Sequence, residues 1–131
     1  MKLFEIFKED DKSIMVFLEV EESSRDNLLK HFPPKYHEVI AHHITYKGPK
    51  NNIPTDKDNF EVVGYTDDGV GLEAVVVAIN GDTTRLDGNL YHITLSIDRS
   101  KGYKPVHSND VIKETGFENI SPPMRINIKK F

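Results

Sequence analysis

Short stretches of alternating apolar and polar residues occur along most of the chain, and this period of two is typical of β-strands with one buried face. In the segment 14–20, Val16 and Leu18 share one face, and Met15 and Phe17 share the other. This pattern, or an unbroken apolar run, predicts strands over residues 3–7, 14–20, 37–46, 60–65, 72–79, 90–97 and 124–128. The chain is therefore expected to be rich in antiparallel β-sheet.

Short helices are expected between the strands, over residues 25–31 and 109–115. A hydroxyl of Ser23 or Ser24 can cap the first helix, and Ser108 can cap the second. Pro33-Pro34 ends the first helix because neither proline has a backbone N–H to donate. Gly116 is suited to end the second helix, since glycine readily adopts the left-handed conformation found at helix C-termini.

A strong turn signal, Asp67-Asp68-Gly69, separates two of the predicted strands and favours a hairpin. No low-complexity segment or long linker divides the 131 residues, so a single domain over residues 1–131 is expected. We expect an α+β fold in which antiparallel sheets and two short helices form two compact lobes. A cleft is expected between these lobes.

The tripeptide His-Ile-Thr occurs twice, at residues 43–45 and 92–94, each time within a predicted strand. Because side chains alternate along a strand, His43 and Thr45 share a face, as do His92 and Thr94. A neutral imidazole can accept a proton while an imidazolium donates one, and a hydroxyl can donate to a phosphate oxygen. The pattern predicts metal-free cleavage of a phosphodiester, with His43 and His92 as acid and base.

A structural explanation of the motifs is also open, because cross-strand polar pairs are common on solvated sheet faces. One copy of the motif would be weak support for function, whereas two identical copies in strands favour it. His42 is expected to face away from His43 and to have a structural role. A zinc site built from His42, His43 and His92 lacks the usual ligand spacing, so neither a metal nor another cofactor is expected.

The 17 basic and 21 acidic residues give a net charge of −4, which disfavours long duplex nucleic acid as a partner. A nucleotide or an RNA end held by a local basic pocket remains compatible with this charge. The chain has no cysteine, so it can form neither disulfides nor thiolate metal sites. No signal peptide or membrane span is recognisable, so we expect a cytoplasmic protein, in its own cell or in an infected host cell, without a membrane partner.

The second motif lies in the run Tyr91-His92-Ile93-Thr94-Leu95-Ser96-Ile97, which is followed by Lys104-Pro105-Val106 and by Ser108-Asn109. These segments resemble the cyclic phosphodiesterase module of tRNA ligases, a member of the 2H phosphoesterase superfamily. That superfamily is named for its paired His-x-Thr/Ser motifs. The first motif, Ala41 to Lys47, matches less extensively, and the resemblance covers about residues 37–114.

The resemblance implies a bilobal antiparallel fold, no metal, His43 and His92 as the acid–base pair, and Thr45 and Thr94 as phosphate ligands. The motifs are closer in sequence than in many members, which implies a compact version. Beyond the motifs, the candidate substrate contacts are Lys47, which can attract phosphate, Tyr103, which can stack on a base, and Ser108, which helix capping explains equally well.

The expected function is therefore a metal-independent phosphodiesterase that hydrolyses 2′,3′-cyclic phosphate RNA ends, as in RNA repair, or small cyclic or 2′-5′-linked nucleotides. A non-catalytic domain that binds nucleotides or RNA ends in the same cleft is the alternative. An interaction protein with incidental motifs is a third possibility. Binding without turnover would separate the second possibility from the first. The third is separated from both by the distance between the His43 and His92 rings and by whether Thr45 and Thr94 face the same cleft.

Overall fold

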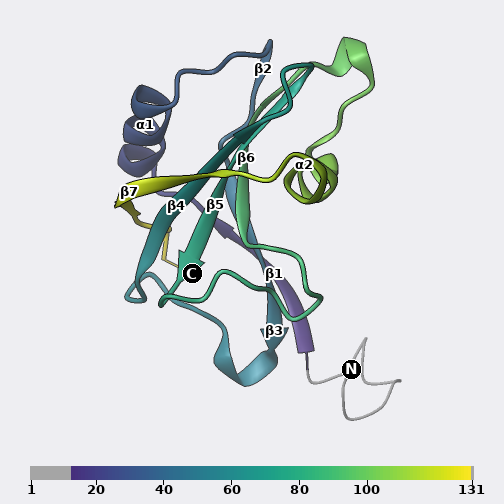
Figure 1. Ribbon diagram of the computed structural model, residues 1–131. Coiled ribbons are helices and arrows are strands. Elements are labelled where there is room, and N and C mark those ends of the chain that lie inside the picture. Colours follow the sequence, from purple (N-terminus) through teal and green to yellow (C-terminus); the bar gives the residue numbers. More distant parts are fainter. Residues whose placement is uncertain (1–12, 131) are drawn as a thin grey trace.

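The computed structural model describes residues 13–130, and this part of the chain forms two antiparallel sheets and two α-helices (Figure 1). The smaller sheet pairs β1 (Ser13–Glu19) with β3 (His43–Pro49). The larger sheet has the strand order β2-β6-β5-β4-β7. Its strands are β2 (Glu38–Val39), β4 (Phe60–Asp67), β5 (Leu72–Ile79), β6 (His92–Ile97) and β7 (Glu118–Ile126). The expected α+β class is confirmed, whereas the strand expected at residues 3–7 lies outside the described residues.

The core lies between the two sheets, and β5 is its centre, since every residue of β5 is buried. Leu18 of β1 and Ile44 of β3 are fully buried against Val75 and Ile93 of the larger sheet. Phe17, on the opposite face of β1, is 58% exposed. The alternation predicted for residues 14–20 is therefore confirmed, and it leaves an apolar surface on the outer face of the smaller sheet.

The two helices lie on opposite faces of the larger sheet (Figure 1). Helix α1 (Glu22–His31) places Leu28 in the main core, and helix α2 (Ser108–Thr115) packs Val111 against the other face of the sheet. Within residues 13–130, no helix is long and apolar enough to span a membrane. The larger sheet is thus covered on both faces, which explains the continuous burial of β5.

The C-terminal ends predicted for the two helices are right, whereas the serines predicted to cap their N-termini are wrong. Helix α1 ends at His31, before the two prolines, and Gly116 ends α2 with a positive φ of 75°. At the other end, Ser24 lies inside the first turn of α1, where its Oγ accepts from the backbone N–H of Asn127 at 2.8 Å. Ser108 likewise belongs to α2 rather than preceding it. The serines are used in tertiary contacts, which a local pattern does not reveal.

The single strand predicted over residues 37–46 is wrong, because the chain leaves one sheet and joins the other within this segment. The backbone runs beside β6 as far as Ala41, whose N–H donates to the carbonyl of Thr94 at 2.8 Å. Ala41 has a φ of 44°, which is unfavourable for a residue with a Cβ. The Arg25 guanidinium donates to the carbonyl oxygens of Ala41 and Ile40, at 3.0 and 3.1 Å, and so holds this turn.

The strand predicted at 124–128 begins earlier, at Glu118, and includes two consecutive prolines. Because β7 is an edge strand, prolines can be accommodated where no ladder hydrogen bond is needed. The pairing of β4 with β7 shifts in register between Val62 and Gly64. The residues of β7 that contain the prolines lie at this shift and have no partner in β4. The hairpin of β4 and β5 forms as expected across the turn at Asp67 and Asp68.

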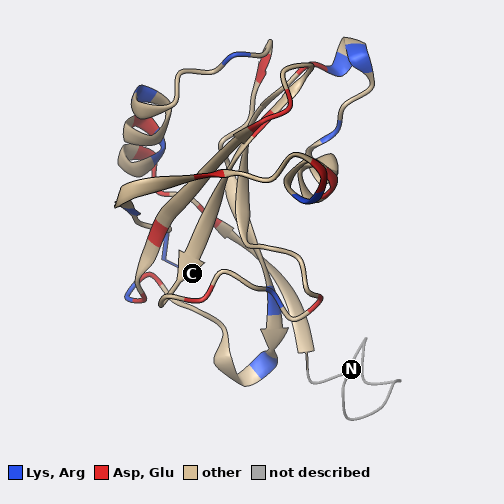
Figure 2. Ribbon diagram, in the orientation of Figure 1, with Lys and Arg blue, Asp and Glu red and all other residues tan. Residues whose placement is uncertain are grey.

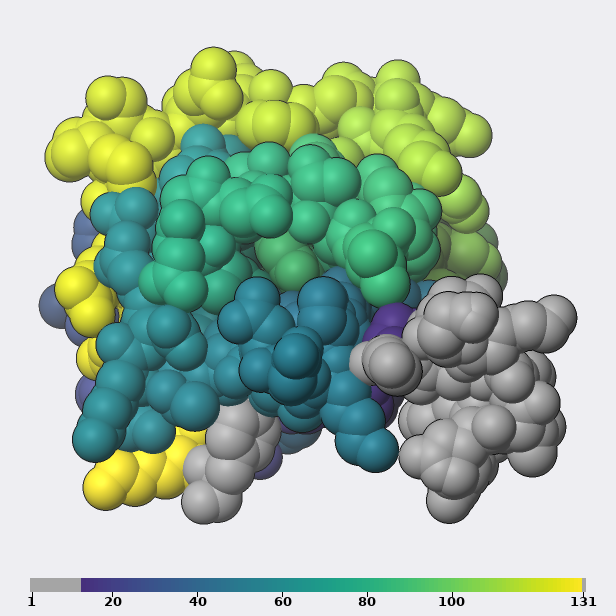
Figure 3. Space-filling view, turned by 90° about the horizontal axis from the view of Figure 1, so that it is seen from below, coloured from purple at the N-terminus to yellow at the C-terminus, as the bar shows by residue number. Residues whose placement is uncertain are grey.

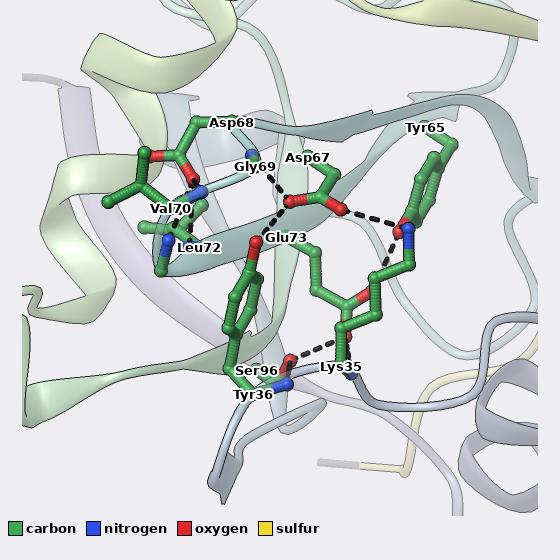
Figure 4. A network of polar contacts seen from close by, with 11 residues as sticks. Lys35, Tyr36, Tyr65, Asp67, Asp68, Gly69, Val70, Leu72, Glu73 and Ser96 are labelled. Carbon is green, nitrogen blue, oxygen red and sulfur yellow. Dashed lines mark hydrogen bonds and ion pairs between the residues drawn. The ribbon is translucent and has the colours of Figure 1, made fainter.

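A polar network with the buried Glu73 and Ser96 at its centre lies at the opposite end of the larger sheet from the turn after β5 (Figure 4). The Glu73 carboxylate, which is fully buried, accepts from the Tyr65 hydroxyl at 2.8 Å, from the backbone N–H of Lys35 at 2.7 Å and from the Ser96 hydroxyl. Asp67 accepts from the Tyr36 hydroxyl at 2.6 Å and from Lys35 Nζ at 2.9 Å. This Glu73 network, formed by Lys35, Tyr36, Tyr65, Asp67, Glu73 and Ser96, ties the segment after α1 to the sheet.

Candidate functional site

Both His-Ile-Thr motifs line one cleft of about 510 Å³. His43 and Thr45 come from β3, and His92 and Thr94 come from β6. The intervening isoleucines, Ile44 and Ile93, are fully buried in the core, which holds both motif strands in this orientation. The remaining lining residues are Met15, Phe17, Ile40, Lys47, Arg85, Asp87, Asn89, Pro105, Val106 and Asn109.

The cleft opens where the smaller sheet diverges from the larger one. Ile40 and Ala41 still pair with β6, through N–H groups that donate to the carbonyls of Leu95 and Thr94, both at 2.8 Å. The next residue, His42, is already joined to the smaller sheet, since its carbonyl accepts from the N–H of Val20 at 2.9 Å. The turn at Ala41 therefore separates β3 from β6, and the motif side chains occupy the gap.

His92 is anchored by the backbone. Its Nδ1 lies 2.9 Å from the carbonyl oxygen of Leu90, and because a carbonyl can only accept, Nδ1 carries the proton and donates. The remaining ring nitrogen, Nε2, is then available to the cleft as a proton acceptor. Burial lowers the pKa of His92 despite the opposing effect of the Leu90 carbonyl, and the positive charge of Arg85 lowers it further. A neutral His92 is thus favoured.

His43 is anchored by a side chain. Its Nδ1 lies 3.1 Å from Nδ1 of His42, and its ring contacts the ring of Phe17 with centroids 4.5 Å apart. Burial lowers the pKa of His43, and charge on His42 lowers it further. Charge on His43 in turn lowers the pKa of His92, so the two motif imidazoles interact electrostatically. A proton on one of them disfavours a proton on the other.

The prediction that His42 faces away from His43 is wrong, although His42 is hydrogen-bonded, which is one of the two structural roles expected for it. The His42 side chain is 57% exposed, and its Nε2 lies 3.5 Å from a carboxylate oxygen of Glu19. The other nitrogen of the ring faces His43. His42 therefore connects Glu19 with His43, although neighbouring side chains on a regular strand would diverge.

The two motif threonines differ in their surroundings. Thr45 is half-buried on the wall of the cleft. Thr94 is 7% exposed, and its hydroxyl lies 2.7 Å from the hydroxyl of Ser108 and 3.3 Å from the carbonyl oxygen of Pro105. Ser108 is fully buried, so it reaches the cleft only through Thr94. A ligand oxygen at Thr94 would have to replace one of these two partners.

A loop between β5 and β6 supplies cleft residues that the sequence analysis missed. The nearly buried Arg85 guanidinium binds both carboxylate oxygens of Asp87, at 3.1 and 2.5 Å. The Lys47 ammonium lies 3.5 Å from Asp87. These hydrogen bonds from Arg85 hold the pKa of Asp87 well below its usual range. The loop reaches the cleft because the N–H of Leu86 donates to the carbonyl of Lys47 at 3.1 Å, and Figure 3 shows it in green against the teal segment that contains Lys47.

The charges of the cleft form a local group rather than part of a basic face. Lysine and arginine segments are scattered between acidic ones over the view in Figure 2. In the cleft, the cations Lys47 and Arg85 are both in contact with Asp87, which balances one of their two charges. This arrangement favours a small ligand with low negative charge over a long polyanion.

Asn109, which the sequence brought in only through the resemblance of the Ser108-Asn109 segment and not as a substrate contact, lies in the first turn of α2. Its Oδ1 is buried and has no hydrogen-bond partner among the described residues, while its Nδ2 is 3.5 Å from the carbonyl of Val106. Buried polar atoms are nearly always satisfied in folded proteins. Asn109 lines the cleft, so a donor on a bound molecule can supply the missing hydrogen bond.

Tyr103, expected to contact substrate, is not among the residues that line the cleft. Its hydroxyl donates to Asp68, and its ring fills the space over Gly71, where an added Cβ would lie 2.6 Å from it. Arg99, in the loop after β6, pairs with Glu38 at 2.5 Å. Among the candidate contacts, Lys47 lines the cleft and Ser108 supports Thr94, while Tyr103 packs elsewhere.

The mouth of the cleft is apolar. Met15 and Phe17 on β1 and Val106 before α2 are each more than half exposed, and all three line the cleft. Exposed apolar side chains that gather at one cleft, unlike single ones scattered over a surface, are typical of a binding site. The cleft thus combines a polar floor of histidines and threonines with apolar sides.

Comparisons with known proteins are negative. No protein-family model matches the chain, no curated protein matches it, and no solved structure matches it. Within residues 13–130, no group of three or more His, Cys, Asp or Glu side chains is placed to hold a metal ion. The functional conclusion therefore rests on the residues of the cleft.

Proposed function

We propose that this protein is a metal-independent phosphodiesterase of the 2H phosphoesterase type, with 2′,3′-cyclic phosphate RNA ends or small cyclic or 2′-5′-linked nucleotides as substrates. The observation that supports this best is the shared cleft. In each motif histidine, Nδ1 is held by a protein group, which leaves Nε2 to act on a ligand. Two imidazoles with opposed roles and two hydroxyls are sufficient for acid–base cleavage of a phosphodiester.

In the proposed reaction, the neutral histidine of the pair His43 and His92 removes a proton from a water molecule, and the oxygen of this water attacks phosphorus. The other histidine, protonated, donates a proton to the ribose oxygen as the bond between phosphorus and that oxygen breaks. The product is a phosphate monoester with a free ribose hydroxyl. Thr45 and Thr94 donate to the non-bridging oxygens, where negative charge develops. The electrostatic coupling of the two imidazoles supports a state in which one is charged and one is neutral.

The apolar mouth supports a nucleotide rather than a simple phosphate ester as the substrate. A base–aromatic stack contributes about 1–3 kcal/mol, and the exposed ring of Phe17 lies beside His43. A base on Phe17 would bring its own phosphate toward the histidines. Lys47 and Arg85, partly balanced by Asp87, suit the single negative charge of a phosphodiester.

The test uses the full chain with excess EDTA and a panel of nucleoside 2′,3′-cyclic phosphates, 2′-5′ oligoadenylate and cyclic oligonucleotides. We expect His43→Ala and His92→Ala to lower kcat/KM by about 10³-fold each, because each removes a proton-transfer group. His31→Ala is the matched control, since His31 is exposed on α1 and bonds only to its own helix. Thermal unfolding monitors the fold. Full turnover in both cleft variants would contradict the proposal.

A non-catalytic domain that binds nucleotides or RNA ends is the second candidate, and one observation favours it. The Thr94 hydroxyl is already engaged by Ser108 and Pro105, so it is not free to donate to a phosphate in this conformation. Binding of the same panel without turnover by the unaltered chain would support this candidate. Calorimetric titration of each nucleotide separates it from the enzyme hypothesis.

A further inference from the structure

The two motif histidines are held in different ways, and the difference has a chemical consequence. His92 donates from Nδ1 to a backbone carbonyl, which cannot change its protonation state. His43 is held at Nδ1 by His42, 3.1 Å away, and Nε2 of His42 lies 3.5 Å from Glu19. We propose that His42 is a positioning residue whose protonation state selects the tautomer of His43, with Glu19 orienting His42. The kinetic consequence rests on the proposed function, whereas the tautomer itself does not.

The proton positions follow from the partners. An ionised Glu19 can only accept, so Nε2 of His42 carries a proton when it faces this carboxylate. A neutral His42 then has a bare Nδ1. Only one proton fits between the two Nδ1 atoms, so it lies on His43, which donates it to His42. Nε2 of His43 consequently keeps its lone pair, the form that can act as a base toward the cleft.

Protonation of His42 reverses this arrangement. The imidazolium donates from Nε2 to Glu19 and from Nδ1 to His43. A neutral His43 must then hold its proton at Nε2, where it can no longer accept one. Charge on His42 also opposes charge on His43, whose pKa is lowered first by burial and then by His42. Protonation of His42 therefore disfavours both the neutral Nδ1–H form of His43, which can act as a base, and its charged form, which can act as an acid. His92 keeps its tautomer throughout.

Other charged groups face His42. A hollow beside His42 is lined by side chains of β1, α1 and the C-terminal segment, namely Glu19, Val20, Glu22, Arg25, Asp26 and Lys129. Lys129 donates to Glu19 at 2.7 Å, and this hydrogen bond lowers the pKa of Glu19. Glu19 therefore stays ionised over the range in which histidines titrate, so it can hold the Nε2–H tautomer of His42.

The decisive measurement is a pH series of nitrogen NMR spectra of the histidine rings, which report the tautomer of each ring directly. In the unaltered chain, we expect neutral His43 to carry its proton at Nδ1 while His42 is neutral and to lose this form once His42 is protonated. His42→Ala removes the acceptor, so His43 is expected to become mostly the Nε2–H tautomer. In His42→Asn, whose Oδ1 can replace the Nδ1 acceptor but cannot titrate, the Nδ1–H tautomer should persist at every pH where His43 is neutral.

Two further variants complete the test. Glu19→Gln replaces a carboxylate that can only accept with an amide that can also donate, so Nε2 of His42 need no longer carry the proton and the Nδ1–H form of neutral His43 should be less populated. His31→Ala should leave the tautomers of both His43 and His92 unchanged. If neutral His43 carries its proton at Nε2 in the unaltered chain, or if His42→Ala leaves the Nδ1–H form unchanged, the proposal is wrong.

Kinetics separate this inference from the proposed function. With a substrate that is turned over, His42→Ala is expected to lower the plateau rate about 10-fold or more, as tautomer loss does in other histidine enzymes, and His42→Asn should restore most of it. The pH–rate profile of the coupled pair should shift in His42→Asn and stay unchanged in His31→Ala. Correct tautomers without any turnover would support the role of His42 and contradict the phosphodiesterase.

Discussion

Two polar clusters of this protein, the Glu73 network and the cleft, are both set among apolar side chains, yet they differ in how completely their hydrogen bonds are formed. Every carboxylate oxygen of Glu73 and Asp67 accepts from a donor in the same network or the adjoining turn. In the cleft, Asn109 Oδ1 has no partner among the described residues. A network with all its hydrogen bonds formed stabilises one arrangement of side chains, whereas a polar atom without a partner can form a hydrogen bond to a ligand.

The location of each cluster explains the difference. The Glu73 network lies where the segment after α1 meets one end of strands β4, β5 and β6, so donors from several elements converge on it (Figure 4). The cleft lies where β3 separates from β6 after Ala41, so no backbone closes it. Polar groups near a divergence of two sheets therefore become accessible, while those under a loop become structural.

The largest effect on stability is expected from Glu73→Ala. The substitution leaves the donors of Tyr65, Ser96 and Lys35 without their acceptor, and a buried donor left unpaired costs about 1–3 kcal/mol, so a total of about 3 kcal/mol or more is expected. Urea unfolding measures the change in the free energy of unfolding. A change below about 1 kcal/mol would show that the network is not the more structural of the two clusters.

A pair of hydroxyl deletions sharpens the comparison. Thr45→Val in the cleft should lower kcat/KM about 10- to 100-fold, because a donor to the developing phosphate charge is lost, with little change in unfolding. Ser96→Ala in the network should do the opposite, with a loss of about 1–2 kcal/mol in stability and no change in rate. Enzyme assays and urea unfolding on the same preparations check both. Equal effects of the two variants would abolish the distinction.

The smallest effect concerns stability against pH. The pKa values of His43 and His92 are lower in the folded chain than the ordinary value of 6.5, so unfolding takes up protons. Their contribution is complete above about pH 6.5 and is lost as the pH falls through the folded values. Hydrogen bonds from Tyr36, Gly69 and Lys35 outweigh burial and lower the pKa of Asp67, so the network loses stability only at more acidic pH.

Urea midpoints measured from pH 8 downward, in about half-unit steps, should therefore fall in two stages. The first stage belongs to the cleft, and a double variant with glutamine at His43 and His92 should flatten it. The second belongs to carboxylates such as Asp67 and should remain in that variant. A first stage that persists unchanged in the double variant would show that the cleft histidines do not cause it.

Much of the fold was predictable because it depends on local patterns. The hairpin of β4 and β5, the end of α1 before its prolines and the Gly116 terminus of α2 follow from turn and helix-end chemistry. The faces of β1 follow from alternation, with Leu18 buried and Phe17 exposed. The position of Tyr103 was not predictable, since its partner Asp68 is far away in the sequence.

Strand periodicity places His43 with Thr45, and His92 with Thr94, on one face of each strand, because the period of a strand is a local property. The three-dimensional fold brought the two faces together, through the turn at Ala41 and through Arg25 of α1, which holds this turn. It also brought Arg85 and Asp87 to the cleft and placed His42 between Glu19 and His43. These arrangements depend on contacts between separate elements, and no local pattern of residues encodes them.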